Sequence, residues 1–212
     1  TIEPMHGSKS AVYAEPAGGV GLWQPIKVLD EALKDGHALA CADYLGVGSD
    51  QIVVGWRAMN DRGIPGIKLF TPLDGEGAGL RVLAYTKPAD PTSEWKYDVV
   101  CDFMHLSHNF HPVNWDDDAE EELIIAGKEG VWYFDRQNDD WAARKLTENF
   151  AGEIRDGRLP NGKRFIVTIE PMHGSKSAVY AEPAGGVGLW QPIKVLDEAL
   201  KDGHALACAE YL

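Results

Sequence analysis

A hairpin built on two aromatic residues recurs along the chain at a nearly constant spacing. A Tyr in a short apolar run is followed by a Trp ten residues later, or eight residues later at the third occurrence. The tyrosines are Tyr13, Tyr85, Tyr133 and Tyr180, at intervals of 72, 48 and 47 residues. A period near 48, long enough for four short strands, is what one blade of a β-propeller requires.

The segments between these hairpins also favour strands. Runs rich in β-branched and aromatic residues are separated by Gly, Pro, Asp and Asn, and they follow one another too closely for intervening helices. We therefore expect an all-β chain, folded over residues 1–212 as a single β-propeller domain of about four antiparallel, four-stranded blades. The innermost strands are expected at residues 37–44, 111–116 and 152–157, each followed by a second strand at 51–57, 121–127 and 163–171.

The first interval, of 72 residues, is about half a blade too long. Residues 58–94 contain two candidates for the same strand, GIKLFTP and LRVLAYT. Either an inserted hairpin or a splice between two blades explains this excess, and the sequence leaves both open.

The chain begins and ends on the same segment. Residues 1–45 recur as residues 168–212 with one difference, Asp43 against Glu210. Because a fold tolerates many substitutions at exposed positions, 44 identities in 45 indicate a very recent or an engineered duplication. The last segment would supply an innermost strand to the first hairpin, so pairing of the two termini would close the ring, within one chain or between two chains.

Composition excludes several classes of partner. A formal net charge of −13 disfavours nucleic acid and anionic membranes, and no apolar run is long enough to span a bilayer. We expect a soluble protein without a visible signal peptide. Three cysteines, none in a C-x-x-C pair, are expected to be buried free thiols rather than disulfides or zinc ligands.

An acidic loop follows the second innermost strand. It reads NWDDDAEEEL and places carboxylates or an amide at Asn114, Asp116, Asp118 and Glu122. Alternating oxygen ligands in a tight turn suit Ca²⁺ or Mg²⁺, and the loop resembles the calcium-loop repeats of FG-GAP or VCBS type found in many propellers. The alternative is a solvated acidic turn, since Asp117 and Ala119 replace the two glycines of that pattern.

Histidines cluster at the opposite ends of the expected strands. His37 begins one innermost strand, His105 and His108 precede the next, and His173 follows a second strand. In a four-stranded meander these points lie on one face, so we expect His37, His108 and His173 to form a Zn²⁺ site with an open coordination position. Histidines that merely bond backbone groups are the alternative.

Further residues on that face complete a candidate active site. Glu170, three residues before His173, is the expected base. Arg57, with His173 and Glu170, is a candidate for catalysis, and Trp56, His37 and His105 are candidates for binding a sugar substrate.

Four stretches carry a more specific resemblance: HLSHN, EELIIAGKEGVWYFD, IEPMHGSKSAVYAEPAG and WQPIKVLDEALKDGHALACAD. They resemble the propeller domain of the fungal aldos-2-ulose dehydratases (pyranosone dehydratases). The resemblance covers about three quarters of the chain and implies metal-dependent dehydration of keto-sugars such as 1,5-anhydrofructose. On matching positions it implies His37, His105, His108 and His173 as site residues. The family has seven blades and cupin domains, which this sequence lacks.

Two hypotheses follow. The chain is a metal-dependent carbohydrate lyase, or it is a non-catalytic propeller scaffold, natural or engineered, that closes on itself or self-associates as a homodimer. The near-identical ends favour the scaffold, and the histidine face favours the enzyme.

Overall fold

A computed structural model of the protein describes residues 1–3, 7–57 and 80–209, and gives the backbone alone for Lys34, Asp35, His37, Trp56, Arg57, Leu80 and Arg81. These residues form strands and turns without a helix, as predicted, so no helix in the described part could span a membrane. They divide into two compact units, residues 1–42 with 48–105 and residues 43–47 with 106–212. Each unit is described by itself.

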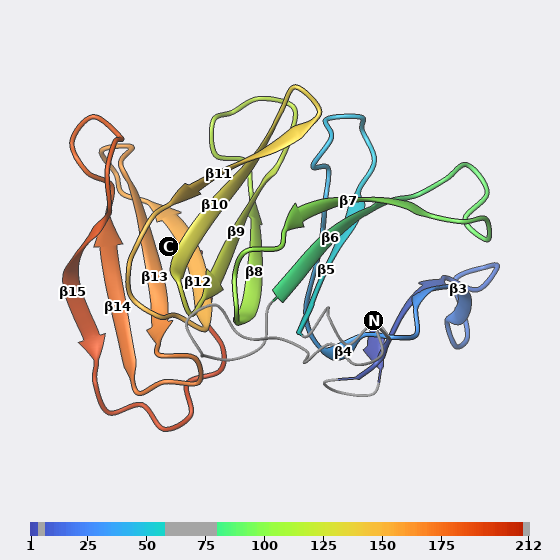
Figure 1. The fold of residues 1–212 in the computed structure, drawn as a ribbon, viewed down its shortest axis with the longest axis horizontal. Coiled ribbons are helices and arrows are strands. Elements are labelled where there is room, and N and C mark those ends of the chain that lie inside the picture. The colour runs from blue at the N-terminus through green and yellow to red at the C-terminus, as the bar shows by residue number, and fades with distance from the viewer. Residues whose placement is uncertain (4–6, 58–79, 210–212) are drawn as a thin grey trace, which may run out of the picture. The chain divides into compact units, whose positions relative to one another are not determined.

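The first unit contains two antiparallel sheets (Figure 1). The three-stranded sheet consists of β1 (Ile2–Glu3), β2 (Lys9–Ala14) and β3 (Gln24–Asp30). The four-stranded sheet consists of β4 (Lys34–Ala42), β5 (Gln51–Arg57), β6 (Leu80–Thr86) and β7 (Lys96–Cys101).

The second unit contains two four-stranded antiparallel sheets in sequence order. The first comprises β8 (Ser107–Val113), β9 (Glu122–Gly127), β10 (Gly130–Gln137) and β11 (Asp140–Lys145). The second comprises β12 (Glu153–Arg158), β13 (Arg164–Glu170), β14 (Lys176–Ala181) and β15 (Gln191–Asp197). With the first unit, this is a β-propeller-like all-β architecture.

The register of the sheets explains the aromatic spacing. In each four-stranded sheet the Tyr of the third strand pairs with an Ile of the second: Tyr85 with Ile52, Tyr133 with Ile124 and Tyr180 with Ile166. The Trp stands at or just before the start of the fourth strand. The three sheets therefore repeat one arrangement, and positions can be compared between them.

Packing between sheets forms an apolar core in each unit. In the second unit Ile124 and Tyr133 of one sheet and Ile166 and Tyr180 of the other share a single core with Trp190. In the first unit Val54, Leu83, Tyr85 and Trp95 form the core, against which Val12 and Leu29 of the three-stranded sheet pack. Alternation along the strands produces this arrangement, because successive side chains point to opposite faces.

Tight turns between strands require particular residues. Gly130, at the β9–β10 turn, has φ +98°, and a Cβ there would lie 2.0 Å from the carbonyl oxygen of Thr147. Both facts exclude a side chain at this position. Because Gly130 carries a hydrogen atom where other residues carry Cβ, β10 can turn back directly against β9.

Two expectations require correction, and a third concerns residues that the structure does not describe. His108 lies inside β8, which begins at Ser107, rather than before the innermost strand. Cys41 is exposed and Cys208 half-buried, so of the three free thiols only Cys101 is buried as expected. Residues 58–79, with the candidate strand GIKLFTP, lie outside the described residues, and Leu80–Thr86 occupies the third strand of its sheet.

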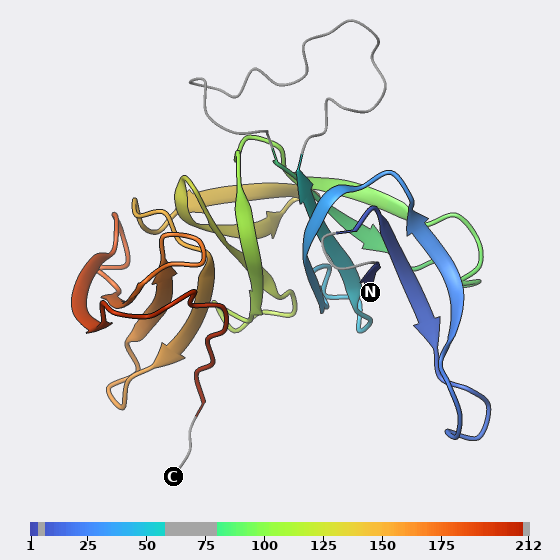
Figure 2. The ribbon, with the colours of Figure 1, turned by 90° about the horizontal axis from the view of Figure 1, so that it is seen from below.

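Pairing of the two termini is not among the described strand pairs. Residues 204–209 belong to no strand, and Figure 2 shows this dark red segment leaving β15. Residues 207–209 line a cavity together with residues 156–158 of β12. At the other end, β1 pairs with β2 and with no other described strand. The sheet that begins the chain is therefore three-stranded where four strands were expected.

Candidate metal centre

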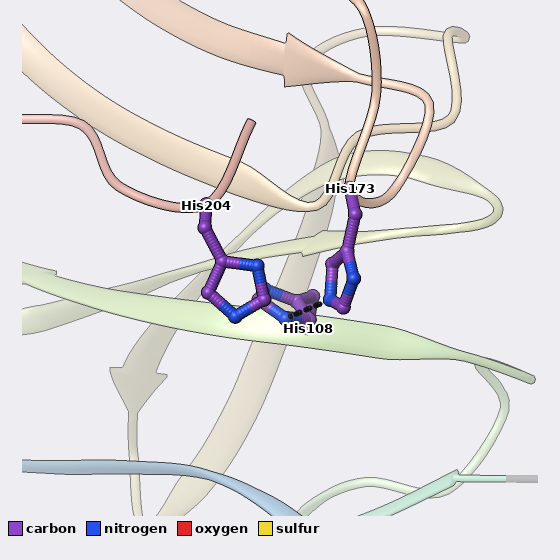
Figure 3. Close-up of side chains that lie close together, drawn as sticks. All are labelled: His108, His173 and His204. Atoms are coloured by element: carbon purple, nitrogen blue, oxygen red, sulfur yellow. Dashed lines mark hydrogen bonds between the residues drawn. The ribbon is translucent and has the colours of Figure 1, made fainter. Parts of the chain in front are cut away.

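Three histidines from distant parts of the sequence converge in the second unit (Figure 3). The ring centroids of His108 and His173 are 4.4 Å apart, those of His173 and His204 are 4.2 Å apart, and those of His108 and His204 are 5.0 Å apart. One ring nitrogen from each lies within 4.8 Å of the others. We refer to His108, His173 and His204 as the histidine cluster.

His108 is placed by an irregularity at the start of β8. The pairing of β8 with β9 skips a residue between Ser107 and Asn109, so His108 occupies a β-bulge. Bulges turn a side chain away from its regular direction and are frequent beside functional sites. The same skip occurs in β4 between Gly36 and Ala38, at the backbone of His37.

A buried carboxylate holds the His108 ring. Nδ1 of His108 lies 2.9 Å from Oε1 of Glu153, and Asn109 donates from Nδ2 to Oε2 of Glu153 at 2.9 Å. Burial by itself would raise the pKa of Glu153, but these two hydrogen bonds outweigh it and lower the pKa overall. The ionised carboxylate fixes a proton on Nδ1 and leaves Nε2 of His108 for the cluster.

His173 stands on a very tight turn after β13. A Cβ on Gly174 would lie 1.9 Å from the carbonyl oxygen of Glu170, and a Cβ on Gly152 would lie 2.1 Å from the carbonyl oxygen of Met172. The two ends of the turn are therefore in contact at Gly174 and Glu170, and the turn packs against the backbone at Gly152, just before β12. This holds Nε2 of His173 2.6 Å from Nε2 of His108.

His204 is tied to the same turn by a backbone hydrogen bond of the preceding residue. The N–H of Gly203 donates to the carbonyl oxygen of Gly174 at 3.1 Å, and a Cβ on Gly203 would contact Ile169 at 2.8 Å. The close approach of these two backbones brings the His204 ring against His173. Since His108 is buried and His204 exposed, the cluster opens to solvent at His204.

The ring nitrogens of the three histidines could hold a zinc ion after a small movement of the rings. Three imidazoles supplied as ligands leave a fourth tetrahedral position open, which is the arrangement of many catalytic zinc sites. Two nitrogens bound to one tetrahedral Zn²⁺ lie roughly 3.3 Å apart, given Zn–N bonds of about 2.0–2.1 Å. The 2.6 Å contact between His108 and His173 is a direct hydrogen bond, so their rings must separate slightly to bind metal.

Of the other histidines whose side chains are described, His105 and His111 are not members of this cluster. The side chains of His37, Trp56 and Arg57 are outside the described part of the structure, and the sequence copy of His37, His204, stands with His108 and His173 instead. His105 ends the first unit and is described with it.

Glu170, the expected base, is buried and fully engaged. It accepts a hydrogen bond from Oγ1 of Thr168 at 2.7 Å and another from the Tyr180 hydroxyl, and Nζ of Lys176 lies 2.6 Å from its Oε2. Asn149 also donates to it, at 3.4 Å. Burial first, and then the bond to Glu170, raise the pKa of Tyr180. Glu170 would have to leave these partners to accept a proton from a substrate.

A second group of potential ligands lies beyond the other end of β8. Oxygens of Asp116, Asp118 and Glu122 approach within 4.8 Å of one another. Asn114 is used inside the turn, where its Oδ1 accepts from the N–H of Asp117 and its Nδ2 donates to the carbonyl oxygen of Asp118. Asp117 adopts φ +67°, the conformation for which the calcium-loop pattern uses Gly.

Glu122 is the buried member of this acidic loop. It is 0% exposed, its Oε2 accepts from the N–H of Trp115, and its Oε1 has no hydrogen-bond partner among the described residues. Burial, together with the negative charges of Asp116, Asp118 and Asp135, raises the pKa of Glu122 to about 7. A bound cation would satisfy Oε1 and relieve this repulsion.

Arg164 supports the base of the acidic loop. Its guanidinium donates to Oδ2 of Asp156 at 2.8 Å and to the carbonyl oxygens of Asn114 and Trp115 at 3.0 and 2.6 Å, and lies 4.5 Å from the Trp115 ring centroid. Nε2 of His111 bonds the other oxygen of Asp156 at 2.9 Å. This network links β8, β12 and β13.

The chain matches no model of a known protein family and no functionally curated protein. The site is therefore interpreted from its own geometry. Glu153 and His204 belong to this site but were not among the site residues predicted from the sequence. The only sequence signal for Glu153 was a carboxylate opening the strand EIRDGR, and the duplication gave no reason to choose His204 over His37.

Proposed function

We propose that the protein is a metal-dependent enzyme of the carbohydrate-lyase type, with its site at the histidine cluster. The observation that carries this proposal is the convergence of three imidazoles, one of them held by a buried carboxylate. The resemblance to aldos-2-ulose dehydratases supports the substrate class, a keto-sugar such as 1,5-anhydrofructose. The open side at His204 supports access of a small molecule from solvent.

The proposed chemistry divides between the metal and the protein. His108, His173 and His204 would hold Zn²⁺, which when bound supplies a Lewis acid able to polarise a sugar carbonyl. Glu153 keeps His108 in the required tautomer. Dehydration next to a carbonyl also needs a base. Glu170 remains the candidate for this role, and Lys176 and Tyr180 set the environment from which it would act.

The test combines metal binding with turnover. The chain is stripped with a chelator, titrated with Zn²⁺ against a competing indicator, and then assayed with 1,5-anhydrofructose for the absorbance of an enone product. His204→Ala should weaken zinc binding, whereas His37→Ala, which changes the same residue in the same sequence context, should not. Absence of zinc binding, or equal effects of the two variants, would reject the histidine cluster as a metal site.

We also propose that the acidic loop binds Ca²⁺ or Mg²⁺ in a structural role. The unpartnered, buried Oε1 of Glu122 supports this proposal, with Asp116 and Asp118 beside it. Calcium should raise the unfolding temperature of the chain, and Glu122→Gln should abolish that response. An unchanged response in Glu122→Gln would remove Glu122 from the site.

A second candidate function is a scaffold without catalysis. Its support is the duplication of residues 1–45 as residues 168–212, with one difference in 45 residues. In this proposal the two ends join, within one chain or between two, and the metal centre is vestigial. Unchanged stability and mass after removal of the C-terminal segment would count against it.

A further inference from the structure

A second carboxylate lies beside the histidine cluster, next to His173. Nε2 of His173 makes the contact with His108 that Figure 3 draws as a dashed line, so Nδ1 is the ring nitrogen of His173 outside that contact. Oδ1 of Asp202 lies 4.0 Å from this Nδ1. Asp202 therefore stands to His173 as Glu153 stands to His108, but at a longer distance.

The backbone on both sides of Asp202 is anchored near His173. Leu200 and Gly203 donate their N–H groups to the carbonyl oxygens of residues 174–175, at 2.9 and 3.1 Å. Asp202 itself has φ +58°, a left-handed conformation in which Asp and Asn are the most common residues after Gly. The Asp202 side chain is 86% exposed, yet its backbone is held in place beside the histidine ring.

The contact between the two rings assigns their protons. Glu153 keeps a proton on Nδ1 of His108, so Nε2 of the neutral His108 ring can only accept a hydrogen bond. Nε2 of His173 must therefore carry the proton of the 2.6 Å bond between them. In the neutral His173 ring this leaves Nδ1 without a proton, and two acceptors do not attract each other. The 4.0 Å separation of Nδ1 from Asp202 agrees with this tautomer.

Binding of a metal through Nε2 requires the other tautomer of His173. A nitrogen that binds a metal needs a free lone pair, so the proton of the neutral ring must lie on the other nitrogen. In His173 that nitrogen is Nδ1, which then becomes a donor. Its N–H would find Oδ1 of Asp202 after a movement of about 1 Å, which brings the two atoms into the usual range of about 2.7–3.2 Å.

We propose that Asp202 is a positioning residue of the metal centre, which accepts a hydrogen bond from Nδ1 of His173 and so favours the tautomer that binds zinc through Nε2. This inference rests on the proposed metal site at the histidine cluster and adds a residue to it. The buried Glu153 holds His108 in the metal-binding tautomer before metal arrives. Asp202 stabilises the corresponding tautomer of His173 only once the metal is bound.

The first experiment measures zinc affinity after removal of the Asp202 carboxylate. Asp202→Gly is the suitable variant because Gly adopts a positive φ without strain, which preserves the turn. We expect zinc to bind about tenfold more weakly, the lower end of the effect of a carboxylate behind a metal-binding histidine, because Asp202 is exposed. Competition with a zinc indicator measures this change.

The duplication supplies a matched control. Asp35 stands before Gly36 and His37 in the same sequence that places Asp202 before Gly203 and His204. Asp35→Gly should leave zinc affinity unchanged. Asp202→Asn keeps an uncharged acceptor and a residue suited to this backbone conformation, so its loss of affinity should be smaller than that of Asp202→Gly and in the same direction.

The second experiment observes the tautomers directly. Two-bond ¹H–¹⁵N correlation spectra of histidine rings distinguish a proton on Nδ1 from one on Nε2. We expect the proton of His173 to be on Nε2 in the metal-free chain and on Nδ1 after zinc is added, while His108 keeps its proton on Nδ1 in both states. A merely structural role of Asp202 would not require this change in His173.

The outcomes separate this inference from the metal site on which it rests. If the unchanged chain binds no zinc, the metal site and the role of Asp202 are both rejected. If the chain binds zinc and Asp202→Gly binds it equally tightly, or if His173 keeps its proton on Nε2 in the zinc-bound chain, the role of Asp202 is rejected while the metal site stands.

Discussion

Nδ1 of His108 and Oε1 of Glu153, 45 residues apart in the sequence, lie 2.9 Å apart at the buried side of the histidine cluster. A carboxylate behind a metal-binding imidazole typically contributes 10–100-fold to metal affinity. We therefore expect Glu153→Gln to weaken zinc binding by roughly 10–100-fold. Competition titration measures this change, with the exposed Glu148→Gln as a control that should bind zinc like the unchanged chain.

Glu153 also predicts a response to acid. Its pKa is lowered in the folded chain, so the stability it contributes is present above the pKa of an unfolded glutamate, near 4.3, and is lost as the pH falls through the folded value. Urea unfolding below pH 5 should show a smaller loss of stability in Glu153→Gln than in the unchanged chain. Equal losses would mean that the interaction with His108 does not persist in solution.

Glu122 predicts the opposite pH dependence, a stability that falls as the pH rises. Its pKa is raised from 4.5 to about 7, so between these values the folded chain retains a proton that the unfolded chain releases. Stability in metal-free buffer should therefore fall as the pH rises from 4.5 to 7 and level off above. Glu122→Gln should remove this fall and stabilise the chain at pH 8 by up to about 3.5 kcal/mol, at ~1.4 kcal/mol for each pKa unit. A steeper fall in the variant would contradict this assignment.

Trp23 and Trp190 form a matched pair within one molecule. They occupy the same place in identical segments, but Trp23 is 56% exposed and Trp190 2% exposed, since Trp190 packs against the sheet β8–β11. Trp190→Ala should cost about 3–5 kcal/mol of unfolding free energy, the usual range for a buried aromatic. Trp23→Ala should cost much less in dilute solution, and chemical denaturation of both variants measures the difference.

Arg164 should be sensitive to loss of its charge. Arg164→Met removes the ion pair of the largely buried Asp156, which then keeps only His111 as a partner. It also removes the hydrogen bonds to two carbonyl oxygens at the base of the acidic loop. We expect a loss of about 3 kcal/mol, the scale of breaking a buried ion pair from one side. Arg158→Met, which removes a more exposed ion pair with Asp117, should change stability by less than about 1 kcal/mol.

The aromatic spacing was sufficient to predict the sheets. Tyr85, Tyr133 and Tyr180 mark the third strand of each, and strand order followed from them. This succeeded because register in a sheet with buried faces is set by side-chain alternation, which the sequence displays directly. The proximity of His108 and His173 was predicted from the meander topology, in which the start of the first strand and the end of the second lie on one face.

Other features depended on contacts that no local pattern records. The bulge that makes His108 part of β8 is a one-residue irregularity in pairing, and Glu153 reaches His108 only through the packing of β12 beside β8. The duplication made His37 and His204 equivalent in sequence, so only the fold could indicate that His204 joins the cluster. Terminal pairing was an expectation that the described strand pairs do not contain.

The two sequence copies share local bonding, since Glu3 contacts Tyr13 and Lys9 as Glu170 contacts Tyr180 and Lys176. They differ in what covers them, because β14 is flanked by the sheet β8–β11 and by a full second strand. Local opening depends on such burial. Backbone amides of β2 should therefore exchange with deuterated solvent much faster than the same amides of β14, and proteases should attack the amino-terminal copy first. One sequence would then act as a flexible segment at one end of the chain and as a rigid segment at the other.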